Sequence, residues 1–505
     1  MGIQVGQVLR QTALRAPERV ALVDLGDPGS ARRELTYAEL DALALRVAAR
    51  LSAAGVEPGD RVGLLAENSA ECTAAWFGIV YAGAAVVPLH VLSAAPELAT
   101  RVGHARCKVL LHDTPRTELA REAGAPQVLS LAEITAAGSG MSLPGHPQLG
   151  AAAMVLYTSG TTGAPKGAVI SHASLLLHTS VLAQRMLGLA ADSVVLCVLP
   201  LSHSYGCRMA LLAPLFAQAR IVMLPRFAAA RSLAAMQEER VTWAPVVPTM
   251  LAAWAECPAA PGGERPAALR WVLSAGAPLG DEVARRAEAR LGVEVRQGYG
   301  MTEATFSAIN APPDERVFGS VGRSVWGVEL RIVDSELRDV TPGETGEVLV
   351  RGHNLMTHYL DDLEANTKLT GDGFLRSGDI GRLDDAGRLY VVDRIKDLII
   401  RGGYNVYPAE VESALAEHPS VVEVAVVGQP DDYYGEEVVA VAVLREACEA
   451  SALAAFADAR LGKMRRPRYY AFVESLPLGP SGKVQKRTLR EWIVAGRLAL
   501  HPASP

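Results

Sequence analysis

Hydrophobic and polar positions follow their clearest pattern between residues 269 and 297. The apolar run "LRWVL" predicts a buried strand, and "DEVARRAEARL" repeats its apolar positions at helical spacing up to Gly292, a residue type that often ends helices. The run "VEVRQ" predicts a second strand. A strand, a helix and a strand in close succession indicate a βαβ unit with parallel strands. Because ligands bind at the carboxyl ends of parallel strands, the loops "SAGAP" and "GYGMTE" should converge on one site.

The longest uncharged run, "CTAAWFGIVYAGAAVVPLHVLSAAP", is long enough to raise the question of a membrane span. Gly78, Gly83, Pro88 and His90 interrupt it, and its second half contains β-branched residues. This pattern predicts a buried helix followed by a buried strand, and no transmembrane segment. The first twenty residues also lack the apolar core of a signal peptide.

The pattern changes near residue 345. The runs "GEVLVRG", "GFLRSGDIGRL" and "RLYVVDR" predict short strands with a glycine-containing hairpin turn, and hence an antiparallel layer. After "DRIKD" the chain follows a compact α+β order whose first helix begins at Pro408. The predicted fold class is therefore α/β and α+β. We expect a large N-terminal domain over residues 1–393, with parallel-sheet α/β layers and a small barrel-like antiparallel layer at about 320–393, followed by a small mobile α+β domain over residues 394–505.

Composition narrows the class of partner. The chain has 505 residues, of which 50% are hydrophobic and 21% are charged, as is usual for globular proteins. Its formal net charge of -6 argues against a nucleic acid partner, because phosphate backbones need a basic footprint. The 6 cysteines form no C-x-x-C pair and no Cys/His pattern suited to zinc, which favours a reducing, cytoplasmic setting. Any anion that the protein binds must therefore be held by a local site.

The stretch "YTSGTTGAPKG", residues 157–167, indicates such a site. Its glycines allow the backbone to approach phosphate oxygens closely, and its hydroxyl groups and Lys166 add donors and charge. It is not a Walker loop, because Lys166 follows Pro165 and no Ser or Thr follows the lysine. Apolar runs on both sides predict a hairpin with this loop at its tip. On composition alone, a phosphate cradle and a mobile surface turn are equally open interpretations.

Five motifs together resemble the adenylate-forming superfamily, which includes acyl-CoA synthetases, peptide-synthetase adenylation domains and luciferases. They are "YTSGTTGAPKG", "GYGMTE", "SGD", "DRIKDLIIRGGYNVYPAEVE" and "PSGKVQKR", in the order typical of that family. The resemblance implies that a carboxylic acid attacks the α-phosphorus of ATP, which gives acyl-AMP and pyrophosphate, and that a thiol then displaces AMP. The implied cofactors are ATP, Mg²⁺ and coenzyme A, or the phosphopantetheine of a carrier protein, and the implied partner is a small carboxylic acid.

The resemblance also assigns roles to single residues. Glu303 is the implied magnesium ligand, and Thr302 is the implied donor to the α-phosphate. Asp379 would accept hydrogen bonds from the ribose hydroxyls with the help of Arg394, and Lys483 would contact the carboxylate and the α-phosphate. Without the resemblance, Asp379 would be read as a turn residue and Lys483 as part of a solvated basic tail. The full set of implied nucleotide contacts is Thr158, Ser159, Gly160, Thr161, Thr162, Gly163, Lys166, Gly276, Ala277, Gly298, Tyr299, Gly300, Asp379 and Arg394.

The end of the chain is implied to move. Lys396 matches the hinge of the family, where a few backbone torsions absorb a rotation of the C-terminal domain. That rotation would withdraw Lys483 after adenylation and bring Gly402 and Gly403 to the site, where they leave room for a pantetheine arm.

The segment "PLSHSYG" matches the part of the family that contacts the acid. His203 would be the gate beside the acyl carboxylate, and we count it among the implied catalytic residues. Amino-acid-activating relatives have an aspartate where this chain has Ser204, and a buried ammonium without a counter-charge is costly, so an α-amino acid is not expected. Arg208 could pair with a second carboxylate on a diacid, but an exposed or backbone-bonded helix residue is the expectation. The predicted acyl pocket favours an uncharged acyl or aryl chain and consists of Ser204, Tyr205, Gly206, Cys207, Val247 and Ala275.

Two other functions stay open. A ligase that loads a holo acyl carrier protein has the same core, and a non-catalytic nucleotide-binding paralogue has the same fold. The second is weakened because Lys166, Glu303, Asp379 and Lys483 are all present. The chain has Asp393 before the ribose-binding arginine and no extra segment there of the kind seen in fatty acyl-AMP ligases, which favours CoA as the acceptor.

Overall fold

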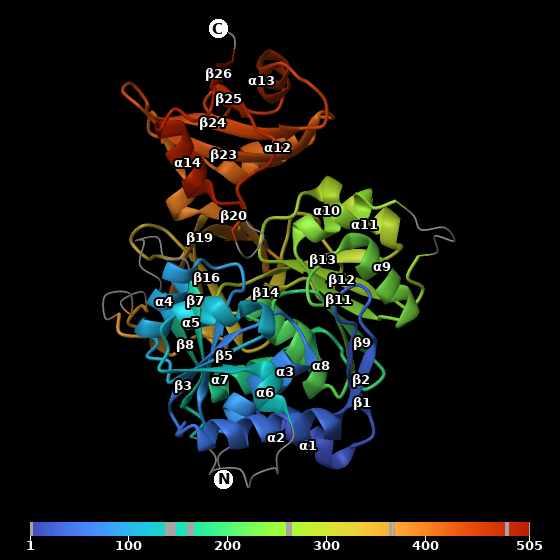
Figure 1. The fold of residues 1–505 in the computed structure, drawn as a ribbon. Coiled ribbons are helices and arrows are strands. Elements are labelled where there is room, and N and C mark those ends of the chain that lie inside the picture. The colour runs from blue at the N-terminus through green and yellow to red at the C-terminus, as the bar shows by residue number, and fades with distance from the viewer. Residues whose placement is uncertain are drawn as a thin grey trace.

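The computed structural model describes residues 4–136, 148–158, 166–258, 265–362, 366, 369–479 and 484–503. They form a large body with two sheets and a smaller C-terminal body with its own sheet, which lies above the large body in Figure 1. The predicted fold class, α/β with a smaller α+β part at the C-terminus, is confirmed.

The largest sheet joins parallel and antiparallel strands edge to edge. From β13 to β1 its neighbouring strands are parallel, and from β13 to β16 they are antiparallel. The predicted antiparallel layer is thus a continuation of the α/β sheet through two short strands, β14 and β15. The strand order is β16 (Val328–Val333), β17 (Gly346–Gly352), β19 (Leu375–Leu383), β20 (Arg388–Arg394), β15 (Gly322–Ser324), β14 (Ala308–Ile309), β13 (Glu294–Tyr299), β12 (Trp271–Ala275), β11 (Trp243–Val246), β9 (Val194–Cys197), β10 (Arg220–Met223), β1 (Val20–Asp24) and β2 (Arg33–Thr36).

The second sheet contains the hairpin that was predicted around the glycine-rich loop. Strands β7 and β8 are antiparallel and Thr158 pairs with Lys166, so the described strands end at the two sides of the loop. The short strand β18 adds to β8 and carries Tyr359 opposite Ala168. The strand order is β18 (His358–Tyr359), β8 (Lys166–Ser171), β7 (Ala152–Thr158), β4 (Ala85–Leu89), β3 (Arg61–Leu65), β5 (Val109–His112) and β6 (Gln127–Ser130).

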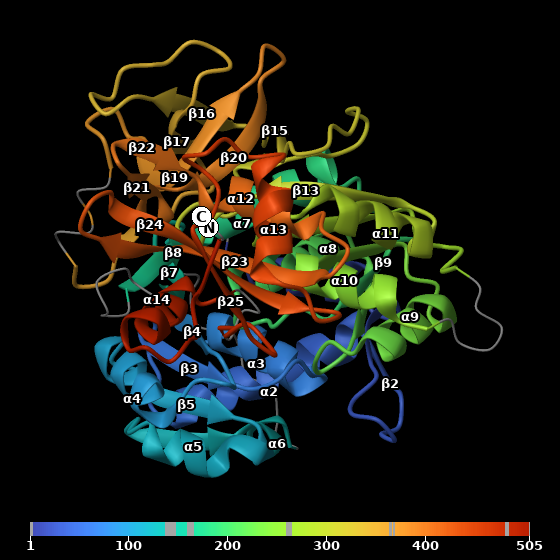
Figure 2. The same cartoon turned by 90° about the horizontal axis from the view of Figure 1, so that it is seen from above.

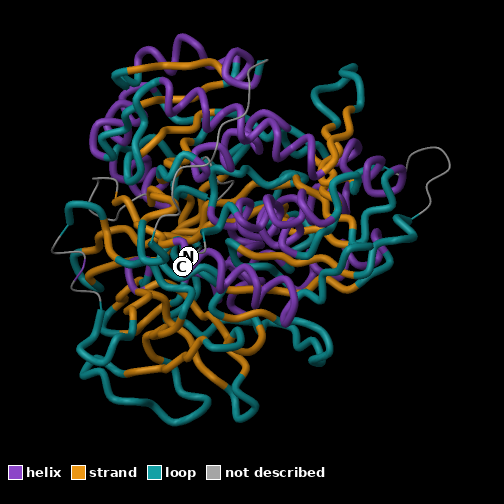
Figure 3. Tube along the Cα trace, turned by 90° about the horizontal axis from the view of Figure 1, so that it is seen from below, coloured by secondary structure: helices purple, strands orange, loops and turns teal. Residues whose placement is uncertain are grey.

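Helices separate and cover these two sheets. One core cluster contains apolar side chains of both sheets and of the helices between them, α1 (Gln7–Arg15), α2 (Tyr37–Ala53), α3 (Ala70–Tyr81), α7 (His172–Val181) and α8 (Ala213–Phe216). The outer face of the large sheet is covered by α9 (Ala229–Glu238), α10 (Pro248–Glu256) and α11 (Asp281–Leu291). The outer face of the second sheet is covered by α4 (Ala95–His104) and α5 (Thr117–Glu122), and the short α6 (Leu131–Thr135) contacts α2 and α3. From below, the antiparallel strands gather at one side without helices over them (Figure 3).

The sequence explains two of these elements directly. Helix α11 has Asp281 and Glu282 in its first turn, where they oppose the positive end of the helix dipole, and it ends at Gly292, which is left-handed with φ +76°. The predicted βαβ unit is confirmed, because β12 and β13 are parallel. In α3, Gly78 lets α2 approach closely, since an added Cβ would lie 2.5 Å from the Val47 side chain.

The long uncharged run forms α3 and then β4, so the predicted buried helix and buried strand are confirmed. Within the described ranges, no helix combines the length and the apolar character that a membrane crossing requires.

The C-terminal body follows the predicted α+β order, with a hairpin that the pattern did not indicate. Helices α12 (Pro408–Ala416) and α13 (Ala450–Asp458) pack on one face of its sheet, and α14 (Lys486–Val494) packs on the other. Seen from above, this body overlies the large one near β20 (Figure 2). Its strands are β21 (Ile399–Arg401), β22 (Tyr404–Val406), β23 (Val421–Asp431), β24 (Gly435–Leu444), β25 (Tyr469–Phe472) and β26 (His501–Pro502).

Candidate active site

The loop "GYGMTE" is the tip of the β13–β14 hairpin, and a glycine makes its shape possible. An added Cβ at Gly300 would lie 2.2 Å from the backbone nitrogen of Phe306, so only glycine fits where the chain folds back. The amide of Ser307 donates to the carbonyl of Tyr299 at 2.8 Å and closes the loop. Ala275, at the end of β12, pairs with Gly298 of β13. The loops "SAGAP" and "GYGMTE" therefore lie side by side, as predicted.

Glu303, on this tip, is held by a tyrosine that the sequence did not single out. The hydroxyl of Tyr359 donates to Oε1 of Glu303 at 2.5 Å, and the amide of Met356 donates to the carbonyl of Glu303 at 2.7 Å. Burial and the Glu303 carboxylate raise the pKa of Tyr359, so its phenol stays protonated and donates. The only signal in the sequence for this contact is a tyrosine shortly before Asp362, in the run "HYLDD".

Lys166 lies near the ring of the same tyrosine. Its Nζ is 5.8 Å from the centre of the Tyr359 ring and 3.3 Å from Oδ2 of Asp362. The neighbouring strands β8 and β18 carry these residues, so strand pairing fixes the lysine relative to Glu303. The structure thus brings Lys166 and Glu303 to one place, with Tyr359 between them.

A second cluster gathers around Asp379. The phenol of Tyr299 donates to Oδ2 of Asp379 at 2.7 Å, and Nε of Arg394 donates to Oδ1 at 2.9 Å. Asp379 and Arg394 face each other across the β19–β20 hairpin, and only 4% of Asp379 is exposed. Burial and the Asp379 carboxylate raise the pKa of Tyr299 well above its usual value. Burial lowers the pKa of Arg394, but Asp379 outweighs burial and the net change is upward.

The segment from Tyr299 to Glu303 belongs to both clusters. Tyr299 contacts Asp379, and Glu303, four residues later, contacts Tyr359. Thr302 lies between them in the chain and is partly buried. Positions four residues apart on one segment thus contact the Asp379 cluster and the Glu303 cluster.

One of the predicted acyl-pocket residues, Ser204, contacts the segment that follows this loop. The hydroxyl of Ser204 lies 2.7 Å from that of Thr305, two residues after Glu303. Tyr205 is buried, and its hydroxyl donates to the carbonyl of Leu273 at 2.7 Å. Gly206 is required, because an added Cβ would lie 2.2 Å from the carbonyl oxygen of Pro200. His203 and Cys207 adjoin these residues in the chain, and the carbonyl of His203 accepts from the amide of Cys207 at 3.0 Å. Val247 directly follows Val246, whose carbonyl accepts from the hydroxyl of Tyr205 at 3.1 Å.

Comparison with known proteins identifies the family. Residues 9–360 match the model of the AMP-binding enzymes, and residues 410–483 match the model of their C-terminal domain. The chain belongs to the AMP-binding enzyme family. It is 35% identical to the sulfoacetate–CoA ligase of Cupriavidus necator over 90% of this chain and 92% of the relative, and 34% identical to the indoleacetate–CoA ligase of Aromatoleum aromaticum over 96% and 95%. ATP-bound MatB from Rhodopseudomonas palustris has a TM-score of 0.90 at 32% identity, over 97% of this chain and 99% of that one.

The AMP-binding enzyme described here is therefore an acyl-CoA synthetase of the AMP-forming type. It uses ATP to convert a carboxylic acid to an acyl-adenylate, and then forms a CoA thioester. The resemblance to the adenylate-forming superfamily, which the five motifs indicated, is confirmed.

Part of the predicted site lies outside the described residues. This holds for Ser159, Gly160, Thr161, Thr162 and Gly163 in the loop between β7 and β8, and for Lys483. Of the other nucleotide contacts, Gly276 has φ +90° directly after β12, with Ala277 next in the chain.

The metal site was predicted at Glu303 alone. Across the described part of the chain, no group of three His, Cys, Asp or Glu side chains is arranged to hold a metal ion. A single carboxylate does fit Mg²⁺, which is usually bound by one or two carboxylates together with phosphate oxygens and water. Tyr359 contacts Oε1 of Glu303, and it leaves Oε2 for a cation.

One expectation about the acyl pocket of this AMP-binding enzyme is wrong. Arg208 was expected to be exposed or bonded to the backbone. It is 0% exposed, and its Nε, Nη1 and Nη2 atoms have no hydrogen-bond partner within the described ranges. The sequence pattern could not show this, because a charged residue on a helix is usually solvated.

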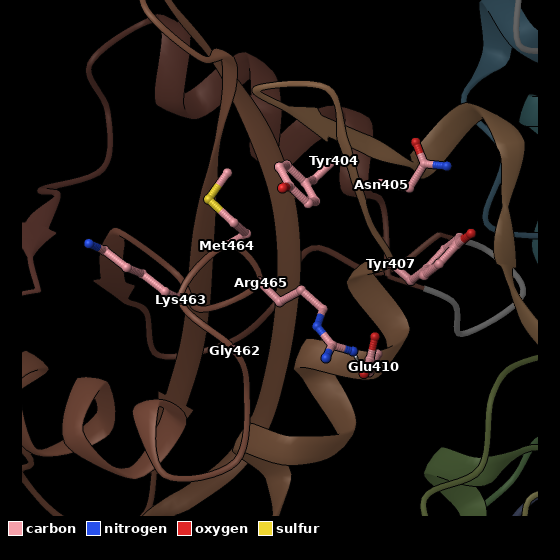
Figure 4. Close-up of a pocket in the computed structure, with 8 residues that line it drawn as sticks. All are labelled: Tyr404, Asn405, Tyr407, Glu410, Gly462, Lys463, Met464 and Arg465. Carbon is pink, nitrogen blue, oxygen red and sulfur yellow. Dashed lines mark hydrogen bonds and ion pairs between the residues drawn. The ribbon is translucent and has the colours of Figure 1, made fainter.

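The remaining predicted residues that the structure describes lie in the C-terminal body. Lys396 is in the short 3₁₀ turn Ile395–Asp397, directly after β20. Gly402 and Gly403 have φ +57° and +81° and form the two-residue turn between β21 and β22, which requires positive φ at both positions. Beside this turn lies a pocket of about 400 Å³ with Arg465 directed toward Glu410 (Figure 4). Its lining residues are Tyr404, Asn405, Tyr407, Glu410, Gly462, Lys463, Met464 and Arg465.

Proposed function

We propose that this enzyme activates a small organic acid at the site built by Glu303 and Asp379, with Mg²⁺ as metal, and transfers it to CoA rather than to a carrier protein. The observation that carries the proposal is the double role of the segment from Tyr299 to Glu303. One rigid loop links the Asp379 cluster to the Glu303 cluster, so a nucleotide with its ribose at Asp379 would have its phosphates beside Thr302 and Glu303.

Asp379 would bind the ribose. An ionised carboxylate can accept from two hydroxyl groups, and Tyr299 and Arg394 fix the orientation of both oxygens. The guanidinium of Arg394 also supplies a counter-charge to this buried carboxylate. Gly276, Ala277, Gly298 and Gly300 would form the backbone surface next to the nucleotide.

Glu303 would hold the magnesium ion, with Tyr359 as its positioning residue. When bound there, Mg²⁺ offsets negative charge on the phosphates. Lys166, Thr158 and the donors of the loop at 159–163 would contact the phosphates, and Thr302 would donate to the α-phosphate. These fixed donors stabilise charge that shifts toward pyrophosphate as the acid attacks, and each typically contributes several kcal/mol.

The acid would approach beside His203. The carboxylate is the nucleophile, and Lys483 would neutralise it and the α-phosphate during adenylation. Ser204 in place of an acidic residue disfavours an α-amino acid substrate, because nothing there pairs with an ammonium group. The acids in the names of the relatives, such as sulfoacetate and indoleacetate, differ widely, so the family alone does not define the acid.

The second half-reaction would require the C-terminal body to turn at Lys396. We place the domain boundary at residues 393 and 394, and propose that the turn brings Gly402 and Gly403 to the acyl-adenylate with the pantetheine thiol. Arg401 supports the wall of the pocket beside these glycines, because its Nη1 donates to the carbonyl oxygens of Lys463 and Met464 at 3.3 and 3.2 Å. We propose a cytoplasmic location, where ATP and CoA are available.

Pyrophosphate release with ATP and Mg²⁺ across a panel of carboxylic acids tests the first half-reaction. Signal above background with at least one acid, lost when Mg²⁺ is removed, is the expected result. Background signal with every acid would favour a non-catalytic nucleotide-binding protein. Thioester formation is then followed by mass with CoA or with a holo carrier protein, and turnover with the carrier protein alone would refute CoA as acceptor.

A further inference from the structure

Among the residues that the structure describes, Arg208 is a buried cation without a hydrogen-bond partner. All three of its guanidinium nitrogens lack a hydrogen-bond acceptor in the part of the chain that the structure describes, and its exposed fraction is 0%. Arg401 shows what a buried arginine normally has, because it pairs with Glu437 at 2.9 Å and donates to backbone carbonyls. An unpaired buried charge destabilises a fold, so its presence points to a partner from outside the chain.

The described residues around Arg208 supply no counter-charge. Burial lowers the pKa of Arg208 to about 10, so the side chain is still protonated at neutral pH. A Cys207 thiolate would oppose that shift, but burial raises the pKa of Cys207 to about 12 and its thiol is neutral. Burial and the Arg208 charge lower the pKa of His178 well below its usual value, so this ring is neutral as well. The cluster therefore carries one uncompensated positive charge.

The position of Arg208 connects it to the proposed acid site. Ser204 and Arg208 are four residues apart in one continuous helical segment, which from Gly206 to Leu212 is a π-helix, so they are separated by about one helical turn. Ser204 contacts Thr305 of the loop that carries Glu303. His178, whose pKa is lowered by the charge of Arg208, also lies beside the carbonyl of Thr305. Arg208 thus lies one helical turn beyond Ser204, behind the loop where the acid would react.

We propose that the acid substrate carries a second anionic group, a carboxylate or a sulfonate, and that Arg208 binds this group. The inference rests on the proposed function and names the class of acid for the same site. A guanidinium donates two parallel N–H bonds to two oxygens of such a group, and the pair is strong where water is excluded. One helical turn is about 5 Å long, so the acid is short, with its second anionic group a few carbons from the carboxylate that reacts.

Matched acids test the preference. We would measure kcat/KM of pyrophosphate release for malonate against monomethyl malonate, succinate against butyrate, and sulfoacetate against propionate. The wild-type enzyme should prefer one of the dianions over its monoanionic counterpart by at least about 100-fold, since leaving a buried charge unpaired is costly. The first two pairs report on carboxylates and the third on sulfonates, so the pair with the largest ratio identifies the second group.

Variants of Arg208 test the assignment. Arg208→Met keeps most of the volume and removes the charge, and it should lower the ratio of kcat/KM for the dianion to that for the monoanion by at least about 100-fold. Arg208→Lys keeps the charge but not the two parallel N–H donors of the guanidinium, and it should give an intermediate ratio. Met209→Leu changes the next buried residue of the same segment without a change in charge, and the ratio should stay as in the wild type.

Thermal unfolding gives a readout that does not depend on turnover. Malonate or sulfoacetate without ATP should raise the Tm of the wild type but not that of Arg208→Met, and ligand-free Arg208→Met should be at least as stable as the wild type, because an unpaired buried charge is gone. A wild-type preference for the monoanionic acids, or an equal loss for all acids in Arg208→Met, would overturn the inference. If no acid supports pyrophosphate release but the anions still stabilise the wild type, the proposed function fails while the anion site stands.

Discussion

The contact between Tyr359 and Glu303 allows a quantitative prediction about adenylation. Tyr359→Phe removes one hydroxyl, which donates to the Glu303 carboxylate at 2.5 Å from a residue that is 1% exposed. A hydrogen bond to a charged group contributes about 1.5–3 kcal/mol net, and a factor of ten corresponds to about 1.4 kcal/mol. If the bond fixes Glu303 for the metal, its loss should lower kcat/KM for ATP in pyrophosphate release by about 10- to 100-fold.

The loss should depend on magnesium. An unrestrained Glu303 binds the ion less well, so the defect should be largest at low Mg²⁺ concentration and should decrease as Mg²⁺ is raised. Conversion of supplied acyl-AMP to the thioester involves no triphosphate and should change little.

Tyr81→Phe is a matched control. Tyr81 is also 1% exposed, and its hydroxyl donates to a carboxylate, that of Asp41, at 2.6 Å, but it lies on α3, in the core of the large body. Both variants should lose similar stability in urea unfolding, and only Tyr359→Phe should lose adenylation activity. Equal activity of the two variants within about twofold, at every Mg²⁺ concentration, would refute the positioning role of Tyr359.

Three further variants test other parts of the scheme. Lys483→Ala should lower adenylation by about 10²–10³-fold and still convert supplied acyl-AMP to thioester, and equal damage to both steps would count against a moving lysine. Lys396→Pro restricts the hinge torsions and should impair mainly the thioester step, so an adenylation defect of the same size would contradict the hinge. Burial lowers the pKa of His172 from 6.5 to about 4, so between these values the unfolded chain binds a proton that the folded chain does not. Stability should therefore fall by about 3 kcal/mol more in the wild type than in His172→Gln between pH 7 and pH 4, as measured by urea unfolding, and parallel pH profiles would contradict this.

The fold was predictable where local pattern and chain connectivity agree. The apolar run before Gly276, the amphipathic helix that ends at Gly292 and the next strand form a βαβ unit as expected. The continuation of the antiparallel strands from the α/β sheet was not predictable, because β14 and β15 are only two and three residues long. Such strands show no periodicity of their own, and their pairing is decided by their neighbours in the sheet.

The candidate site was predictable from motifs but not from spacing. Tyr299, Asp379 and Arg394 come from separate motifs, and the structure brings them into contact. Tyr359 escaped prediction because its role depends on β18 pairing with β8, a contact across almost 200 residues. Arg208 was interpreted wrongly for a related reason, since burial of a helix face is set by the whole core and not by the residue itself.

The described contacts also explain how the C-terminal body could turn without release of the nucleotide. The groups proposed for ribose and metal, Asp379 and Glu303, are fixed within the large body by buried hydrogen bonds. Two other described contacts join the C-terminal body to the large body. The exposed pair of Arg445 and Glu256 is separated by 3.7 Å, and such pairs contribute about 0–1 kcal/mol. The buried carboxylate of Asp393 accepts from the amide of Ala409 at 2.9 Å, at the start of α12. A rotation of the proposed kind would break these two contacts and would change the distance between Lys483 and the phosphates. Nucleotide binding should thus depend on the large body, and the chemical step on where the C-terminal body lies.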